Sequence, residues 1–191
     1  EKKQVNILNC SFSNDHDNNK IKKMFKIFYK NVKNIKYYDI NVPFMEGNEF
    51  KNNNNLNNKL IKLRVRSFKD LIILNKKIDK KLDIILINFK GYLFKYTNDI
   101  NFEQSNIISQ FYNILFCLKN QKKNGVSHMM FKSVLTSQSV ELLYILKKYY
   151  DKILLIPTDF ELMIQNKISV IASGFKGISK NELLDLYKLG N

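Results

Sequence analysis

The segment Leu82–Ile87 constrains the fold of this chain more than any other. It is a nearly continuous run of aliphatic residues, interrupted only by Asp83. Such a run is typical of a central strand in a parallel sheet, because a strand that is covered on both faces has no side that faces water. Parallel strands are joined by long crossover connections, which are usually helices. The segment therefore predicts an α/β protein.

Strand and helix patterns alternate along the rest of the chain. Apolar runs predict further strands over 5–10, 35–42, 60–65, 126–132, 152–156 and 168–172. Helical spacing of apolar residues predicts helices over 18–29, 68–77, 107–118 and 137–149. We expect Gly125 to close the third of these helical segments. The pattern favours one doubly wound, mostly parallel sheet with helices on both faces, and any ligand at the carboxyl ends of the strands.

Length and composition fit a single domain. The chain has 191 residues, of which 45% are hydrophobic, and this is enough for one packed core. We expect residues 1–177 to form the domain, with a polar, asparagine-rich insertion over 44–58, and residues 178–191 to form a helical tail. In the tail, Ser179 precedes Glu182 by three residues, which is the spacing of a helix-capping box.

The sequence lacks the spacing patterns of a metal site or a disulfide framework. Cys10 and Cys117 lie in apolar surroundings without a CxxC or Cys/His pattern. His128 lies in a predicted strand, where a packed histidine is commoner than a catalytic one. No apolar run reaches the roughly 20 residues that span a bilayer. We therefore expect no metal, no membrane span, and an intracellular, reducing compartment.

The strong positive charge of the chain indicates a polyanionic partner. The formal net charge is +15, and lysine supplies nearly all of the positive charge because Arg64 and Arg66 are the only arginines. Such an excess attracts RNA, although a lysine-rich composition would also raise the charge everywhere and leave each lysine a merely solvated side chain. Candidate phosphate contacts are Lys22, Lys23, Lys26, Lys30, Lys33, Lys36, Lys62, Arg64 and Arg66.

Several strings in the second half of the chain resemble the FtsJ/RrmJ family of RNA ribose 2'-O-methyltransferases. They are Asn124 and Gly125 followed by 129–132 (MMFK), 152–154 (KIL) with Pro157, and 170–176 (VIASGFK). The resemblance implies a Rossmann-like methyltransferase fold that uses S-adenosylmethionine. It also identifies positions at which the family's chemistry can be checked.

The catalytic positions of the family are altered in this chain. The family uses two lysines, an aspartate and a glutamate, and the resemblance matches Lys132 to the second lysine, Asn88 to the aspartate and Lys167 to the glutamate. A lysine held between carboxylates can position the ribose hydroxyl and stabilise the alkoxide that forms. Because both carboxylates are replaced, we expect Lys132 to be vestigial.

The cofactor positions are altered in the same way. The resemblance implies that S-adenosylmethionine closely approaches the turn after the first strand, where glycines are needed. The segment 9–15 (NCSFSND) contains no glycine. Ser67 stands where the family has an aspartate for the adenine amino group, and Asp39 is a weak candidate for a cofactor contact. We expect no bound cofactor, or S-adenosylmethionine if the chain is active.

These observations predict a catalytically degenerate methyltransferase-fold protein that binds RNA. We expect rRNA as its partner, a role as structural component or assembly factor of an organellar ribosome, and ribosomal proteins as further partners, in the mitochondrion or another organelle. One alternative is an active 2'-O-methyltransferase that uses Lys132 with relocated acids. Another is a protein-interaction module whose tail docks onto a neighbour through Leu183, Leu186 and Leu189, although terminal helices more often fold onto their own domain.

Overall fold

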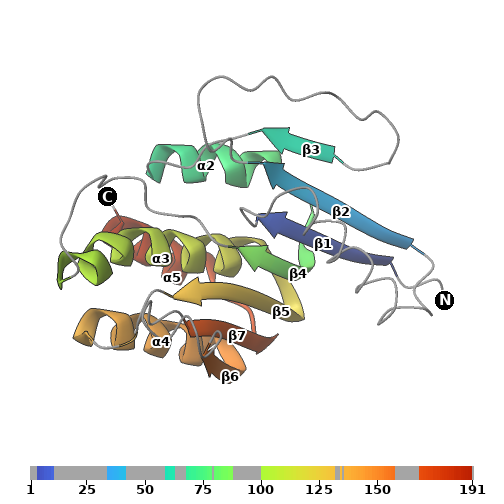
Figure 1. Ribbon diagram of the computed structural model, residues 1–191. Helices are drawn as coiled ribbons and strands as arrows, with labels where there is room; N and C mark the ends of the chain where they lie inside the picture. Colours follow the sequence, from blue (N-terminus) through green and yellow to red (C-terminus); the bar gives the residue numbers. More distant parts are fainter. Residues whose placement is uncertain are drawn as a thin grey trace.

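Figure 1 presents the computed structural model of the chain. The structure describes residues 4–10, 34–41, 59–62, 68–78, 80–87, 100–131, 134, 136–157 and 168–190. For residues 4, 6, 8–10, 34–41, 59–62, 68, 70, 77 and 100–105 it describes the backbone without the side chains. The helix predicted over 18–29 and the insertion predicted over 44–58 lie outside the described residues.

The strands within these ranges form one seven-stranded sheet in the order β3-β2-β1-β4-β5-β7-β6. Their bounds are β1 (Gln4–Cys10), β2 (Asn34–Asn41), β3 (Lys59–Lys62), β4 (Leu82–Ile87), β5 (Gln121–Phe131), β6 (Tyr150–Pro157) and β7 (Ile168–Phe175). Strands β1 to β5 pair in parallel, whereas β7 runs antiparallel to both β5 and β6. The predicted open, mostly parallel α/β sheet is therefore confirmed.

Four helices are described: α2 (Phe68–Lys77), α3 (Ile100–Asn120), α4 (Ser137–Tyr149) and α5 (Lys180–Leu189). Helix α3 lies between α2 and α4 and also contacts α5 (Figure 1). Contacts of α3 with β4 and β5, and of α4 with β6, place these helices on the sheet. Within the described residues, no helix combines the length and the apolar character needed to cross a bilayer.

The hydrophobic core fills the space between this helix layer and one face of the sheet. Ile85 of β4, Met129 of β5 and Val170 of β7 lie on that face and are buried. Ile114 and Phe116, in the middle of α3, belong to the same core cluster and have no exposed surface. Burying apolar surface of this kind contributes about 25 cal/mol per Å², so the contact between α3 and the sheet is a main source of stability.

The expectation that Gly125 closes a helix is wrong. Helix α3 ends at Asn120, and β5 begins at the next residue, so Gly125 lies inside the strand. A Cβ atom at this position would come within 2.1 Å of the Gln121 Nε2 atom and 2.9 Å of the Asp83 carbonyl oxygen. Gly125 is therefore required for a close approach of β5 to β4, and not as a helix terminator.

The tail folds onto the domain. Its helix α5 begins with the predicted capping box, in which Ser179 and Glu182 each satisfy a backbone N–H of the other. Leu183 is only 8% exposed and belongs to the core, while Leu186 packs against the core from its edge. Leu189 is 75% exposed. Leu183 is therefore not available to dock the tail onto a neighbour, because its side chain is already buried in its own domain.

Candidate functional site

The carboxyl ends of the central strands meet at one edge of the sheet. In the parallel ladders Cys10 pairs with Ile87, and Ile87 pairs with Met129. In the antiparallel ladder Phe131, the last residue of β5, pairs with Ile168, the first residue of β7. The strand order reverses between β1 and β4, and open α/β sheets bind their ligands outside the carboxyl ends at such a point.

The three positions that the resemblance matches to the family's catalytic groups come directly after or before strands that end or begin at this edge. Asn88 follows the end of β4, Lys132 follows the end of β5, and Lys167 precedes the start of β7. All three residues lie outside the described residues. The strand ends to which they are joined are neighbours in the sheet, because Ile87 pairs with Met129 and Phe131 pairs with Ile168.

The cofactor candidates are only partly described. Asp39 lies in β2, two residues before the end of the strand, and its backbone pairs with Asn9 of β1. Its backbone is thus at the carboxyl edge of the sheet, while its side chain lies outside the described residues. Ser67 and the glycine-free segment after β1 also lie outside them.

The candidate phosphate contacts likewise fall beyond what the structure describes in side-chain detail. Lys36 lies in β2 and Lys62 ends β3, each with a described backbone only. Outside the described residues lie Lys22, Lys23, Lys26, Lys30, Lys33, Arg64 and Arg66. Their role in RNA binding stays a prediction.

His128 is a packed histidine, as expected from its place in a strand. Its Nε2 atom lies 2.5 Å from the Ser169 hydroxyl oxygen across the ladder between β5 and β7. Burial lowers the pKa of the ring below its usual value, so the ring is neutral at neutral pH. Ser169 is itself buried. The geometry supports a packing contact between two polar groups and provides no exposed nucleophile.

A second polar contact lies inside the core. The Ser127 hydroxyl donates to the Tyr150 hydroxyl oxygen at 3.1 Å, and the buried Cys117 thiol lies beside Ser127. Burial raises the pKa of Cys117 to about 12 and raises that of Tyr150 well above its usual value. All three side chains are therefore uncharged at neutral pH, and their role is structural. Cys117 is a buried free thiol.

Sequence reasoning missed a buried polar stripe on α3. Asn106, Ser109, Gln110 and Asn113 are all buried, around the middle of the helix. Both polar atoms of the Gln110 side chain are buried without a hydrogen-bond partner among the described residues. Polar residues at helical spacing inside an otherwise apolar helix are the signal that could have identified this stripe.

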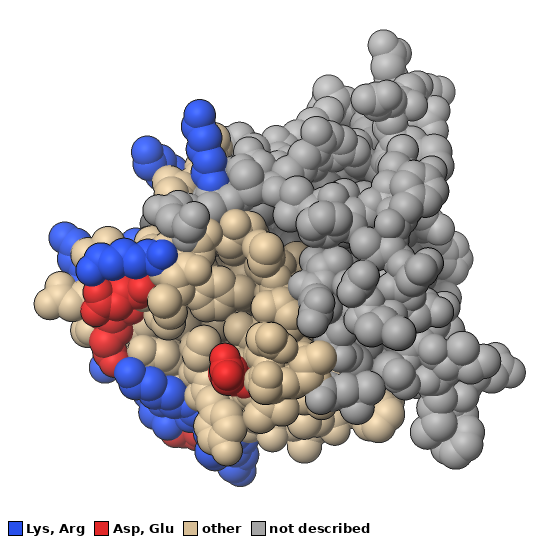
Figure 2. Space-filling view, turned by 90° about the vertical axis from the view of Figure 1, so that its left-hand side faces the viewer, with Lys and Arg blue, Asp and Glu red and all other residues tan. Residues whose placement is uncertain are grey.

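The positive charge is not spread evenly over the described surface. Figure 2 shows the left-hand side of Figure 1, on which the described lysines lie along the margins, several with an acidic group beside them. The middle of that described surface is largely uncharged. On this side, the described lysines therefore do not form one continuous basic patch across the middle of the surface.

Comparison with known proteins decides the fold. No family model matches the sequence, and no curated protein matches it as a relative. A solved structure of a protein named as a ribosomal RNA methyltransferase of Plasmodium falciparum superposes with a TM-score of 0.59 at 18% identity, over 93% of this chain and 89% of that one. The chain has an FtsJ-like methyltransferase fold. The fold implied by the FtsJ/RrmJ resemblance is therefore confirmed.

Two further solved structures are similar at lower scores. An rRNA methylase from Streptococcus thermophilus has a TM-score of 0.48 at 11% identity, over 91% of this chain and 88% of that one. A fibrillarin pre-rRNA processing protein from Methanococcus jannaschii has a TM-score of 0.48 at 13% identity, over 93% of this chain and 69% of that one.

Within the methyltransferase fold, the edge that would hold a methyl donor is the one formed by the ends of β1, β2 and β4. S-adenosylmethionine requires a turn whose backbone it can approach closely, and glycine permits this because it has no Cβ atom. The segment that follows β1 has no glycine between Asn9 and Asp15. The acidic residues at these positions are Asp15, at the end of that segment, and Asp39 on β2. The expected absence of a bound cofactor therefore stays a prediction.

Proposed function

We propose that this chain is an RNA-binding protein that retains the methyltransferase fold without methyltransferase activity. The proposal rests on the neighbouring ends of β4, β5 and β7. The residues next to those ends in the sequence are Asn88, Lys132 and Lys167, which supply one amide and two ammonium groups. A site made of these groups has no carboxylate to position or accept a proton.

The charge state of Lys132 depends on the groups that surround it. Methyl transfer to a ribose hydroxyl requires that the hydroxyl be oriented and that its proton be removed during attack. A carboxylate beside a lysine stabilises the ammonium form, whereas a second ammonium disfavours it. Asn88 replaces one carboxylate and Lys167 replaces the other. The ammonium form of Lys132 therefore loses the carboxylates that would stabilise it and gains an ammonium group that disfavours it.

The RNA partner is supported by charge and by similarity of fold. The net charge of +15 attracts polyanions, and phosphate contacts supply most of the sequence-independent affinity for nucleic acid. The Plasmodium falciparum protein of the same fold is named as a ribosomal RNA methyltransferase. We propose rRNA as the partner, and a role as structural component or assembly factor of an organellar ribosome, in contact with ribosomal proteins there.

Binding to an rRNA fragment at increasing salt tests the RNA-binding half of the proposal. Fluorescence anisotropy with a labelled fragment should show binding at about 50 mM salt and an affinity loss on the order of 10³-fold by about 200 mM if six or more phosphates are contacted. Absence of binding at low salt, or an affinity that does not fall with salt, would contradict it.

One observation favours a working methyltransferase as the second candidate. Lys132 is retained directly after β5, and the backbone of Asp39 lies at the carboxyl edge of the sheet. Calorimetric titration with S-adenosylmethionine separates the two candidates. Saturable heat at micromolar concentrations favours the enzyme, whereas no heat at millimolar concentrations favours the degenerate protein.

A further inference from the structure

A second edge of the sheet, opposite to the carboxyl ends, carries a protruding basic segment. Between two points of the parallel ladder, β4 advances from Leu82 to Ile84 while β5 advances from Gln121 to Val126, so β5 has three extra residues. Such a bulge pushes residues out of the ladder. The protruding residues are Lys122, Lys123 and Asn124, and all three are exposed.

The backbone supports this protrusion. Asn124 has φ 62°, a left-handed conformation that asparagine tolerates better than most residues. The Gln121 side chain is buried, and its Nε2 atom donates to the carbonyl oxygens of Leu82 and Asp83 at 2.9 and 3.0 Å. The bulge is therefore fixed at its base, while its lysines face solvent.

Further lysines continue the basic surface toward α3. The Lys81 ammonium donates to the Lys119 carbonyl oxygen at 2.5 Å, at the end of α3. Burial, and then the charge of Lys119, lowers the pKa of Lys81. Lys81 thus satisfies a terminal carbonyl of the helix, as basic residues commonly do. The Lys119 side chain has no ion-pair partner among the described residues.

The surface also continues across the sheet toward β7 and β6. The Lys123 Cε atom lies 3.2 Å from the place that a Cβ on Gly177 would occupy, so this lysine lies beside the end of β7. The Lys176 ammonium donates to the Lys148 carbonyl oxygen at 3.2 Å. Lys152, on β6, pairs through its backbone with Ser173 of β7.

We call these lysines the amino-edge row, because the parallel strands β4, β5 and β6 begin beside them. The row consists of Lys81, Lys119, Lys122, Lys123, Lys148, Lys152 and Lys176, all exposed. Among the described residues, Lys122 forms an ion pair with Asp83 at 3.0 Å, and Lys148 forms one with Glu182 at 2.9 Å. Asp151 is a third nearby acid. Four members of the row, Lys119, Lys123, Lys152 and Lys176, form no ion pair among the described residues.

We propose that the amino-edge row binds the phosphate backbone of RNA. This inference rests on the proposed function and assigns the RNA to an edge of the sheet away from the carboxyl ends. Adjacent strands are about 4.8 Å apart, so a row across β4, β5, β7 and β6 extends about 15 Å, which is long enough to meet several successive phosphates. The six residues of β4 separate the two edges by about 20 Å.

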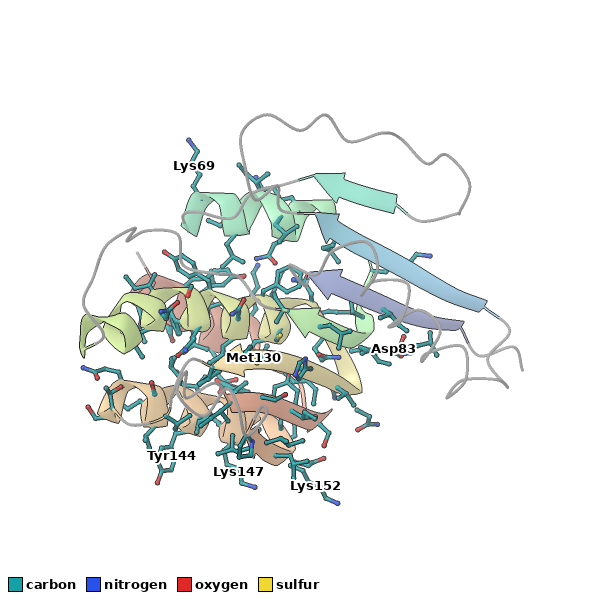
Figure 3. The ribbon with its side chains drawn as sticks, viewed as in Figure 1. Lys69, Asp83, Met130, Tyr144, Lys147 and Lys152 are labelled. Atoms are coloured by element: carbon teal, nitrogen blue, oxygen red, sulfur yellow. The ribbon has the colours of Figure 1, made fainter. Side chains whose placement is uncertain are left out.

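The test compares two double variants with equal loss of charge. Lys123→Gln with Lys152→Gln removes two members of the row whose ammonium groups form no ion pair and no hydrogen bond among the described residues. Lys69→Gln with Lys188→Gln removes two exposed lysines elsewhere. Figure 3 shows Lys69 on α2 and Lys152 on β6 at opposite ends of the view. Equal thermal midpoints for both variants confirm that folding is unaffected.

The readout is the slope of log affinity against log salt concentration for an rRNA fragment. Each lost phosphate contact in single-stranded RNA reduces the slope by roughly 0.7, so the row variant should lose about 1.4 and the control variant almost nothing. Equal slopes for both variants, with RNA still bound by the wild type, would overturn the row and leave the proposed function intact. No binding of RNA by the wild type, or binding to polyglutamate in place of RNA, would overturn both the amino-edge row and the proposed function.

Discussion

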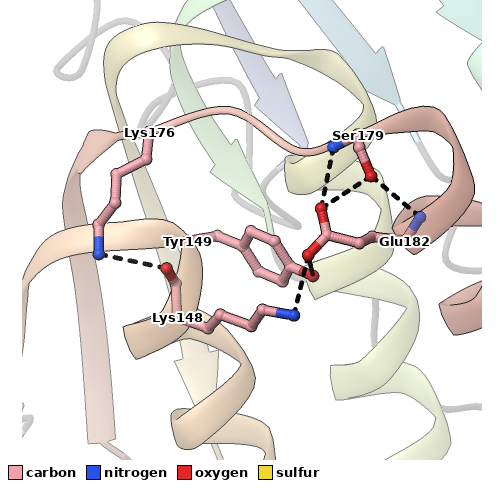
Figure 4. A network of polar contacts seen from close by, with 5 residues as sticks. All are labelled: Lys148, Tyr149, Lys176, Ser179 and Glu182. Atoms are coloured by element: carbon pink, nitrogen blue, oxygen red, sulfur yellow. Dashed lines mark hydrogen bonds and ion pairs between the residues drawn. The ribbon is translucent and has the colours of Figure 1, made fainter.

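The ammonium of Lys148 lies 2.9 Å from the Oε1 atom of Glu182, and this ion pair ties the end of α4 to the start of α5. The same carboxylate accepts hydrogen bonds from the Tyr149 hydroxyl, the Ser179 hydroxyl and the Ser179 backbone N–H, while Lys176 binds the Lys148 carbonyl nearby (Figure 4). The network closes the tail onto the domain, and its central group is titratable.

Acid should loosen this closure. Hydrogen bonds from Lys148 and then from Ser179 lower the pKa of Glu182 from 4.5 to about 2. A group with a lowered folded pKa stabilises the protein above its unfolded pKa, and this stabilisation is lost as pH falls from about 4.5 to about 2. The protection factors of the α5 amides, which remove the intrinsic pH dependence of hydrogen exchange, should therefore fall over that range. Glu182→Gln should exchange faster at neutral pH and lose the dependence; an unchanged acid profile in this variant would contradict the assignment.

Truncation of two leucines in the tail should have unequal effects on stability. Leu183 is 8% exposed and Leu189 is 75% exposed. Leu183→Ala should reduce the free energy of unfolding by about 2 to 4 kcal/mol, because it leaves a cavity in the core. Leu189→Ala should change it by no more than about 0.5 kcal/mol. Urea unfolding followed by circular dichroism measures both; similar costs for the two variants would show that α5 does not pack as described.

Substitutions at the β5 bulge should have opposite signs. Gly125→Ala should destabilise the protein by about 1 to 3 kcal/mol, because its Cβ would meet the Gln121 side chain and the Asp83 carbonyl oxygen. Asn124→Gly should be neutral or slightly stabilising, because glycine adopts φ 62° without strain. Denaturation midpoints of the two single variants check the pair. A tolerated Gly125→Ala would mean that β5 does not approach β4 this closely.

The Cys117 thiol should be inert in the folded protein. Its pKa is raised to about 12 by burial, and the thiolate is the reactive form. In a Cys10→Ala background, labelling with a thiol reagent at neutral pH should be slow and should become fast in denaturant. Stability that depends on the protonated thiol is present below the ordinary pKa of 9.0 and is lost as pH rises toward about 12. Rapid labelling without denaturant would contradict the burial of Cys117.

Much of the fold could be predicted from the sequence, because its central elements are long and regular. The ranges of α2, β4 and α4 were predicted residue for residue, and the capping box at Ser179 was predicted from spacing alone. The start of α3 was placed at residue 107 and not at residue 100, because residues 103–106 (EQSN) are polar and give no apolar period. The start of β5 was missed because Lys122 and Lys123 protrude from the ladder and break the strand pattern.

The candidate site was predictable in part. The order of strands implies that the ends of β4 and β5 meet at one edge, so the positions of Asn88 and Lys132 in the sequence were enough to relate them. The amino-edge row was not predictable. Lys123 and Lys176 are far apart in the sequence, and only the antiparallel insertion of β7 between β5 and β6 brings their strands together.

Capture of an rRNA fragment by the protein in the presence of S-adenosylmethionine with a labelled methyl group tests the central claim most directly. RNA binding without catalysis predicts that the RNA is retained at low salt, is released as salt rises, and carries no label above that of a reaction without protein. Label on the 2'-oxygen of the retained RNA would contradict the claim, because it would show that the carboxyl edge of the sheet still performs methyl transfer.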